Sequence, residues 1–189
     1  MIFEPINVSL DEECIASFVR RYHFSKDEKN DIYRAYKQLK PRVHACFHYY
    51  IENADKQGLP VCYVVMTLGK AFDELEESLL EKGDIQKAYM IDCLGLELMS
   101  LAYNEIDKKI SEITGLYTGG YIFAGSDEMP LSEMPEAFDK LRQGLVTYNE
   151  AYVLMPKKSV LFKTFLHKEK QVKHSRCRSC NAKKCSLRL

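Results

Sequence analysis

One uninterrupted stretch of helical periodicity, at residues 84–113, constrains the fold of this chain more than any other feature. Apolar side chains recur there every three or four residues: Ala88, Ile91, Leu94, Leu98, Leu101, Ile106, Ile110 and Ile113. Asp84 can cap the start of such a helix, and Gly83 and Gly115 punctuate its two ends. The pattern predicts a helix of roughly thirty residues, long for a globular protein, as the central element of the fold.

Shorter patterns on either side of this helix predict further elements. Helices are expected at residues 8–23, 27–39, 44–53, 68–82 and 132–144. Strands are expected at residues 61–67, 117–123, 151–155 and 159–166. Helices come first and most strands come late, which favours the α+β class, with a mainly antiparallel sheet packed with long helices.

Length and charge limit what the chain can be. With 189 residues it has the size of one domain, which we place at residues 1–170, followed by a basic, cysteine-rich tail at 171–189. Lys plus Arg and Asp plus Glu both total 27, so no overall charge points to nucleic acid or to a membrane. The sequence has no secretory signal and no apolar stretch of about eighteen residues. We therefore expect a cytoplasmic protein without nucleic acid or membrane partners.

The tail carries Cys177, Cys180 and Cys185 in a C-x2-C-x4-C pattern, with His174 three residues before the first cysteine. Thiolates at this spacing can converge on one metal ion or cluster iron, and structural zinc sites usually have four ligands. The four residues therefore predict a metal centre, either zinc or an iron–sulfur cluster with one open iron. A redox-labile thiol cluster and a disordered basic tail with no metal role are the alternatives.

Other positions are candidates for binding a small molecule or a metal. Gly119-Gly120, inside a predicted strand, indicates a bulge or a place where a ligand approaches the backbone closely. Asp127, in the loop that follows, can face a ligand amine or ribose or can belong to a solvated acidic loop. His44 and His48 lie four residues apart on a predicted helix, but the sequence offers them no adjacent third ligand. The remaining cysteines are expected to be small buried residues: Cys14, Cys46, Cys62 and Cys93.

Three segments of the second half resemble one protein family. Asn149 to Val160, N-E-A-Y-V-L-M-P-K-K-S-V, resembles L-T-E-S-x-x-M-x-P-x-x-S-V of that family. Gly125 to Leu131, G-S-D-E-M-P-L, resembles its G-Y-G-D-x-P-L, and the cysteine-rich ending resembles the tail of its free-standing members. The family is the reactivation (S-adenosylmethionine-binding) domain of cobalamin-dependent methionine synthase. The resemblance covers about residues 61–189.

The resemblance implies a function and a set of binding residues. Such a domain binds S-adenosylmethionine over an oxidised corrinoid, so that its reduction is trapped by methylation, and the cofactors supply the difficult chemistry. The implied partner is a corrinoid protein or a cobalamin-dependent methyltransferase that holds the cobalamin. Lys157-Lys158-Ser159 can contact a corrinoid amide or a phosphate, or can form a polar turn. The implied cofactor-binding residues are Gly119, Gly120, Tyr121, Gly125, Asp127 and Glu150.

Two anchors that the family uses for S-adenosylmethionine are absent from this sequence. The Arg of its R-x-x-P-G-Y stretch can pair with the ligand carboxylate, for which a forked donor is suited. One alignment places Tyr121, Ala124, Gly125 and Ser126 at the Arg, Pro, Gly and Tyr of that stretch, and a shifted alignment that uses Gly120-Tyr121 places Leu116 at the Arg. The long helix of the family carries an Asp with a Glu eight residues on, whereas Asp92 is followed at that spacing by Ser100. The alternative function is a non-enzymatic interaction or metal-binding module that keeps the fold and has lost S-adenosylmethionine.

Overall fold

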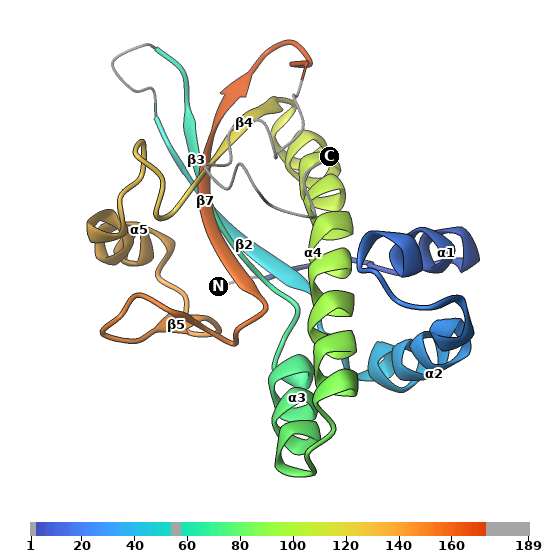
Figure 1. Cartoon of the computed structure of the whole chain (residues 1–189). Helices are drawn as coiled ribbons and strands as arrows, with labels where there is room; N and C mark the ends of the chain where they lie inside the picture. Colours follow the sequence, from blue (N-terminus) through green and yellow to red (C-terminus); the bar gives the residue numbers. More distant parts are fainter. Residues whose placement is uncertain (1–2, 54–57, 173–189) are drawn as a thin grey trace. The chain divides into compact units, whose positions relative to one another are not determined.

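The computed structural model of the chain describes residues 3–53 and 58–172, and its helices and antiparallel strand pairs confirm the predicted α+β class (Figure 1). The helices are α1 (Glu12–Arg21), α2 (Lys29–Leu39), α3 (Ala71–Glu81), α4 (Ile85–Thr114) and α5 (Met134–Leu141). Three short 3-10 turns are η1 (Lys26–Glu28), η2 (Lys40–Arg42) and η3 (Leu131–Glu133).

The strands are β1 (Glu4–Pro5), β2 (Cys46–Glu52), β3 (Val61–Thr67), β4 (Tyr117–Phe123), β5 (Thr147–Tyr148), β6 (Leu154–Met155) and β7 (Ser159–His167). Five of them form one sheet in the order β1-β2-β3-β7-β4, and β5 and β6 form a separate two-stranded sheet. β1 pairs with β2, β4 with β7, and β5 with β6, each antiparallel. β4 is therefore an edge strand of the larger sheet.

The long helix predicted at 84–113 is observed as α4, with each bound shifted by one residue. The side chain of Asp84 accepts a hydrogen bond from the backbone N–H of Lys87 at 3.2 Å, which confirms its capping role. Gly115 ends the helix at φ +70°, a left-handed conformation that glycine adopts without strain. The stripe that predicted the helix is buried at Ala88, Ile91, Leu94, Leu98, Ile106 and Ile110.

Two of the predicted elements are wrong. Residues 44–53, predicted as a helix, contain strand β2, because a run rich in aromatic residues suits a pleated sheet next to other strands. Residues 151–155, predicted as a strand of the main sheet, contribute only β6. The side chain of Asn149 accepts hydrogen bonds from the N–H groups of Ala151 and Val153, both at 3.0 Å, and holds this segment in a turn.

The chain divides into two compact units that interleave along the sequence. Unit 1 comprises Met1–His48, Val65–Ile106 and Gln143–Val160. Unit 2 comprises Tyr49–Val64, Asp107–Arg142 and Leu161–Leu189. The predicted division into one domain at 1–170 and a tail at 171–189 stays a prediction.

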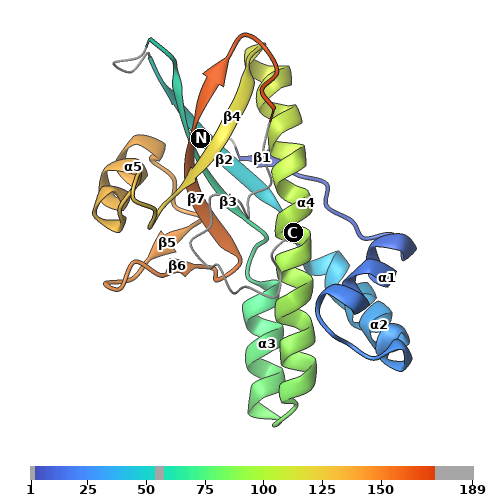
Figure 2. The ribbon, with the colours of Figure 1, turned by 45° about the horizontal axis from the view of Figure 1, so that its top comes forward.

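Unit 1 contains the helices α1, α2 and α3 and the first two-thirds of α4. Helices α3 and α4 lie side by side, as both views of the ribbon show (Figures 1 and 2). Arg21 of α1 donates two hydrogen bonds to the carboxylate of Glu97 on α4, at 2.9 and 2.8 Å. Glu97 is only 7% exposed, so this pair ties two helices together in a water-poor environment.

Unit 2 contains α5, β4 and parts of β2, β3 and β7. The Lys140 ammonium on α5 contacts a carboxylate oxygen of Glu52 and one of Glu136, both at 2.9 Å, and the Tyr63 hydroxyl at 3.3 Å. Burial alone lowers the pKa of Lys140, but these hydrogen bonds outweigh that effect and the pKa is raised. No helix in the described part of the chain has the length and apolar character needed to cross a bilayer.

Candidate functional site

The two glycines predicted to mark a ligand site lie in a β-bulge of β4. Thr118 pairs with Leu166 of β7 and Tyr121 pairs with Thr164, so Gly119 and Gly120 together oppose a single residue of the partner strand. The sequence indicated either a bulge or a close approach of a ligand at these glycines, and the bulge is observed. It interrupts the ladder at the edge of the sheet and leaves backbone groups there without their regular strand partners.

The two glycines have different surroundings. A Cβ added to Gly119 would lie 2.8 Å from Nε2 of His167, so no larger residue fits there without displacing the imidazole. A Cβ added to Gly120 would meet no heavy atom of the described residues within 4 Å, and Gly120 is exposed. Gly119 is therefore required by packing, whereas Gly120 presents open backbone to solvent.

Asp107 of α4 holds the two residues that flank the bulge. The hydroxyl of Thr118 donates to Oδ1 of Asp107 at 2.5 Å, and the hydroxyl of Tyr121 donates to the same oxygen. The ring of Tyr121 also packs against Phe162, with centroids 4.5 Å apart. In the first of the two sequence alignments, Tyr121 is the residue at the position of the family arginine, and this alignment stays a prediction. The Tyr121 side chain is uncharged and engaged in the core of unit 2.

The loop after β4 is a tight turn with a buried hydroxyl. Gly125 has φ +91°, and its N–H donates to the carbonyl of Met129 at 2.8 Å, which closes the turn. Met129 is fully buried, whereas Asp127 is exposed near the tip. The hydroxyl oxygen of Ser126 is buried and has no hydrogen-bond partner among the described residues. An unpartnered buried hydroxyl is costly, which makes this loop a candidate ligand contact.

The prediction of a strand at 151–155 places Glu150 at a strand start. Instead, Glu150 is exposed in the turn between β5 and β6. It belongs to unit 1, whereas Gly119, Gly120, Tyr121, Gly125 and Asp127 belong to unit 2. The assignment of these six residues to a cofactor stays a prediction.

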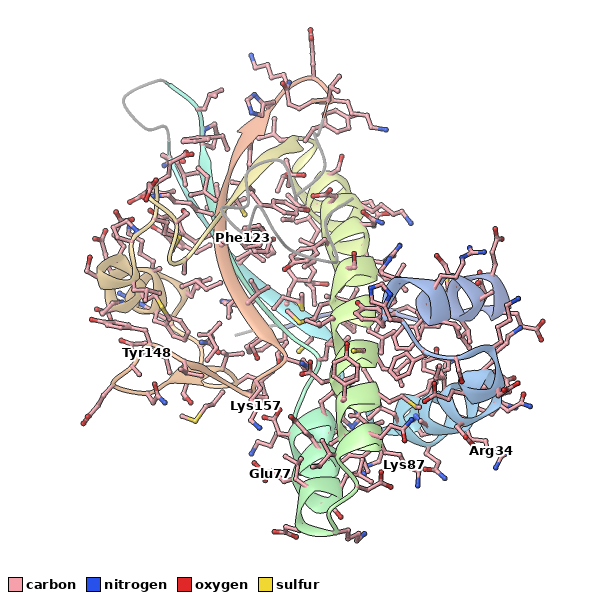
Figure 3. All side chains as sticks on the ribbon, in the orientation of Figure 1. Arg34, Glu77, Lys87, Phe123, Tyr148 and Lys157 are labelled. Atoms are coloured by element: carbon pink, nitrogen blue, oxygen red, sulfur yellow. The ribbon has the colours of Figure 1, made fainter. Side chains whose placement is uncertain are left out.

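Lys157 and Lys158, which precede β7, form ion pairs with two helices in addition to the turn that was one of the predictions. Lys157, which Figure 3 labels, is exposed. Its ammonium lies 3.4 Å from the carboxylate of Glu76 on α3. Lys158 is only 7% exposed, and its ammonium contacts the carboxylate of Asp92 on α4. The carbonyl oxygen of Lys158 accepts a 2.9 Å hydrogen bond from the N–H of Leu68. Lys158 therefore connects the residues after β3 with the middle of α4.

The sequence carried one signal for this arrangement, a glycine inside the long helix. A Cβ on Gly95 would lie 2.5 Å from Cε and 2.9 Å from Cδ of Lys158. Glycine is unfavourable in a helix interior unless a close approach requires it. Gly95 leaves the space through which the Lys158 side chain reaches Asp92.

The predicted metal ligands His174, Cys177, Cys180 and Cys185 lie outside the described residues. Within residues 3–53 and 58–172, no three His, Cys, Asp or Glu side chains are grouped so that they could hold a metal ion. His44 and His48 do not share a helical face, because His48 belongs to strand β2 and His44 precedes it.

Cys14, Cys46, Cys62 and Cys93 are free thiols. The expected burial is confirmed for Cys62 and Cys93, whereas Cys14 and Cys46 are only partly buried. Burial raises the pKa of Cys62 to about 12 and also raises the pKa values of Cys46 and Cys93. These groups therefore stay protonated at neutral pH, which makes them poor nucleophiles and poor metal ligands.

No protein-family model matches this chain, and no curated protein matches it. Among solved structures, it is similar to the crystal structure of the MetH reactivation domain bound to AdoHcy. The TM-score is 0.48 at 10% sequence identity, and the match covers 92% of this chain and 81% of that chain. The AdoHcy is a ligand of that protein. The resemblance of this chain to the family depends on the sequence motifs at residues 125–131 and 149–160 and in the tail.

Proposed function

We propose that this chain is a stand-alone homologue of the reactivation domain of cobalamin-dependent methionine synthase. It supports the reductive methylation of a corrinoid that a partner protein holds. S-Adenosylmethionine supplies the methyl group and leaves as S-adenosylhomocysteine, and an external reductant supplies the electron that the oxidised cobalt requires. The chain contributes binding and orientation and no nucleophile of its own.

One observation carries this proposal: a glycine bulge on an edge strand leads directly into a tight glycine turn with a buried, unpartnered hydroxyl. Gly120 offers open backbone, and Ser126 has a hydroxyl with no partner among the described residues. Both features suit a ligand that approaches the backbone closely and donates or accepts hydrogen bonds there. Asp127 can then accept from a ligand amine or from the ribose hydroxyls.

The binding part of the proposal is tested by calorimetric titration of S-adenosylmethionine and S-adenosylhomocysteine into the full chain and into Gly120→Val. Since a Cβ at residue 120 meets no described atom within 4 Å, the variant should fold normally and block the approach of the ligand. Gly144→Val is the matched control, because its Cβ also meets nothing within 4 Å. We expect Gly120→Val to weaken binding by about tenfold or more and Gly144→Val to leave it unchanged.

The reaction part is tested with free oxidised cobalamin, a low-potential reductant and S-adenosylmethionine. The full chain should accelerate the appearance of methylcobalamin, followed by absorbance, and Gly120→Val should not. Formation of methylcobalamin at the same rate with and without the chain would contradict a role in the reaction even if the ligand binds.

A second candidate function is an interaction or metal-binding module that has lost S-adenosylmethionine. It is favoured by Tyr121, whose hydroxyl and ring are engaged with Asp107 and Phe162 at the position of the family arginine. The absence of S-adenosylmethionine binding at high micromolar concentration, together with a stoichiometric metal in the purified protein, would select this second function.

A further inference from the structure

One face of α2, together with the residue that follows the helix, carries a stripe of positive charge. Lys29, Lys37 and Lys40 are exposed, and within the described part of the chain none of them forms an ion pair with a carboxylate. At about 100° per residue, all three lie within about 40° of Tyr33 around the helix axis. Tyr33 is 38% exposed, and the Lys37 ammonium lies 4.6 Å from the centroid of its ring. This basic face therefore has one aromatic ring among three unpaired positive charges.

The outer face of α3 carries the opposite charge. Glu77, which Figure 3 labels, and Glu81 are exposed, and neither forms an ion pair with a basic side chain among the described residues. Leu80 is 47% exposed. The spacing of the three residues, at i, i+3 and i+4, places them next to one another on the helix surface. This acidic face therefore has one apolar side chain beside two unpaired negative charges.

The basic face and the acidic face both belong to unit 1, but they do not pair within one chain. Both views of the ribbon place α2 and α3 on opposite sides of the N-terminal half of α4 (Figures 1 and 2). The whole chain has 27 basic and 27 acidic residues, so copies of it are not kept apart by a net charge. Each copy thus offers one face of each sign to another copy.

We propose that the basic face of α2 docks on the acidic face of α3 in a second copy of this chain. The ring of Tyr33 packs against Leu80, and the lysines one turn to either side of the ring face the two glutamates. An apolar centre with a charged rim is the usual anatomy of a protein interface. The charges select the face of opposite sign and reject a face of like sign.

This contact is heterologous, because one copy contributes α2 and the other contributes α3. Every pair keeps one unused basic face and one unused acidic face, so further copies can add. The average mass in solution should therefore rise with protein concentration above the 21.9 kDa of a single chain. Salt should weaken the association, because exposed charges are screened beyond about 10 Å at 0.1 M ionic strength.

The test is sedimentation equilibrium of the full chain and of two charge-reversed variants at low ionic strength. Lys29→Glu with Lys37→Glu reverses the charge of the basic face, and Glu77→Lys with Glu81→Lys reverses that of the acidic face. We expect each variant alone to associate with itself about tenfold more weakly than the unaltered chain, or less. An equimolar mixture of the two should associate again, because the first variant keeps its acidic face and the second keeps its basic face.

Two controls separate the faces from charge in general. Lys168→Glu with Lys170→Glu changes the net charge by the same amount as the first variant, at exposed positions outside both faces, and should associate like the unaltered chain. Leu80→Ser changes no charge and should weaken association by about threefold or more. Ile113→Ser is its matched control, because Ile113 is also 47% exposed and lies outside both faces.

A single-chain mass at millimolar concentration and low salt overturns the proposal. Self-association that neither charge-reversed variant weakens also overturns it, since another surface then joins the copies. Where one variant fails to fold, by circular dichroism, the other decides alone, because each removes one of the two faces. The contact uses no residue of the candidate ligand site at 119–127, so its failure leaves the proposed function untouched, and the reverse also holds.

Discussion

At residue 95, in the middle of α4, an alanine would displace the side chain of Lys158 or Phe72. Its Cβ would lie 2.5 Å from Cε of Lys158 and 3.1 Å from Cδ1 of Phe72. Alanine favours a helix interior over glycine by about 1 kcal/mol, whereas overpacking a core costs about 1–3 kcal/mol. The steric term is the larger of the two, so this glycine is explained by the side chain that crosses it.

We therefore expect Gly95→Ala to lower the free energy of unfolding by up to about 2 kcal/mol, measured by urea denaturation. In a Lys158→Ala background, the lysine atoms that clash are gone. There the same substitution should cost clearly less, because only the 3.1 Å contact with Cδ1 of Phe72 remains and the helix propensity of alanine opposes it. Equal effects in the two backgrounds would mean that Lys158 is not the reason for the glycine.

The buried thiol of Cys62 makes the stability of the protein depend on pH. Its thiol is fully buried, and burial raises its pKa from 9.0 to about 12. Because the unfolded chain loses this proton first, the contribution of the group to stability is complete below pH 9 and is lost as the pH rises towards 12. At pH 9, iodoacetamide should alkylate Cys62 only in urea, as followed by mass spectrometry. Cys14, which is partly exposed, is the internal control and should react in the native protein.

At the scale of elements, the bulge of β4 depends on α4 as much as on its own glycines. Asp107 accepts from the hydroxyls of both Thr118 and Tyr121, one on each side of Gly119-Gly120. The bulged strand is therefore fixed to the helix at two points, which holds the open backbone of Gly120 in one conformation. A ligand that binds there meets a surface already ordered by the core of unit 2.

Replacing Asp107 with Ala should lower the free energy of unfolding by about 2 kcal/mol or more, because it removes an acceptor from a buried and a half-buried hydroxyl. Hydrogen exchange of the β4 amides, measured by mass spectrometry, should rise more than that of α1. Asp107→Asn keeps one carbonyl oxygen and should lose less than half as much stability. Unchanged exchange in β4 would show that the strand does not depend on Asp107.

At the scale of the whole molecule, the sequence predicts a metal centre in the tail, in addition to the α+β fold. Three thiolates next to Arg176, Arg178, Lys183 and Lys184 should have lowered pKa values, since positive neighbours favour the charged form. The basic side chains also offset the negative charge of a thiolate cluster.

Protein purified without oxygen or chelator should therefore contain about one equivalent of zinc, or iron with sulfide, by elemental analysis. Cys180→Ser should abolish the metal, and Cys14→Ser, outside the tail, should retain it. Less than about a tenth of an equivalent in the unaltered protein would count against a metal role.

Local patterns in the sequence determined the long helix, the bounds of β3 and β4 and the α+β class. The 3.6-residue stripe of α4, its Asp84 cap and its Gly115 terminator act within a few residues of one another, so the sequence reports them directly. The glycine pair at 119–120 predicted a bulge for the same reason.

Only the tertiary structure decided the features that join distant segments. Residues 46–52 became a strand because neighbouring strands accept their aromatic side chains, a long-range effect that outweighed the local pattern. The pairing of Lys158 with Asp92 and of Glu97 with Arg21 joins residues 66 and 76 positions apart. No local spacing specifies such pairs, because packing brings them together and then requires each buried charge to find a partner.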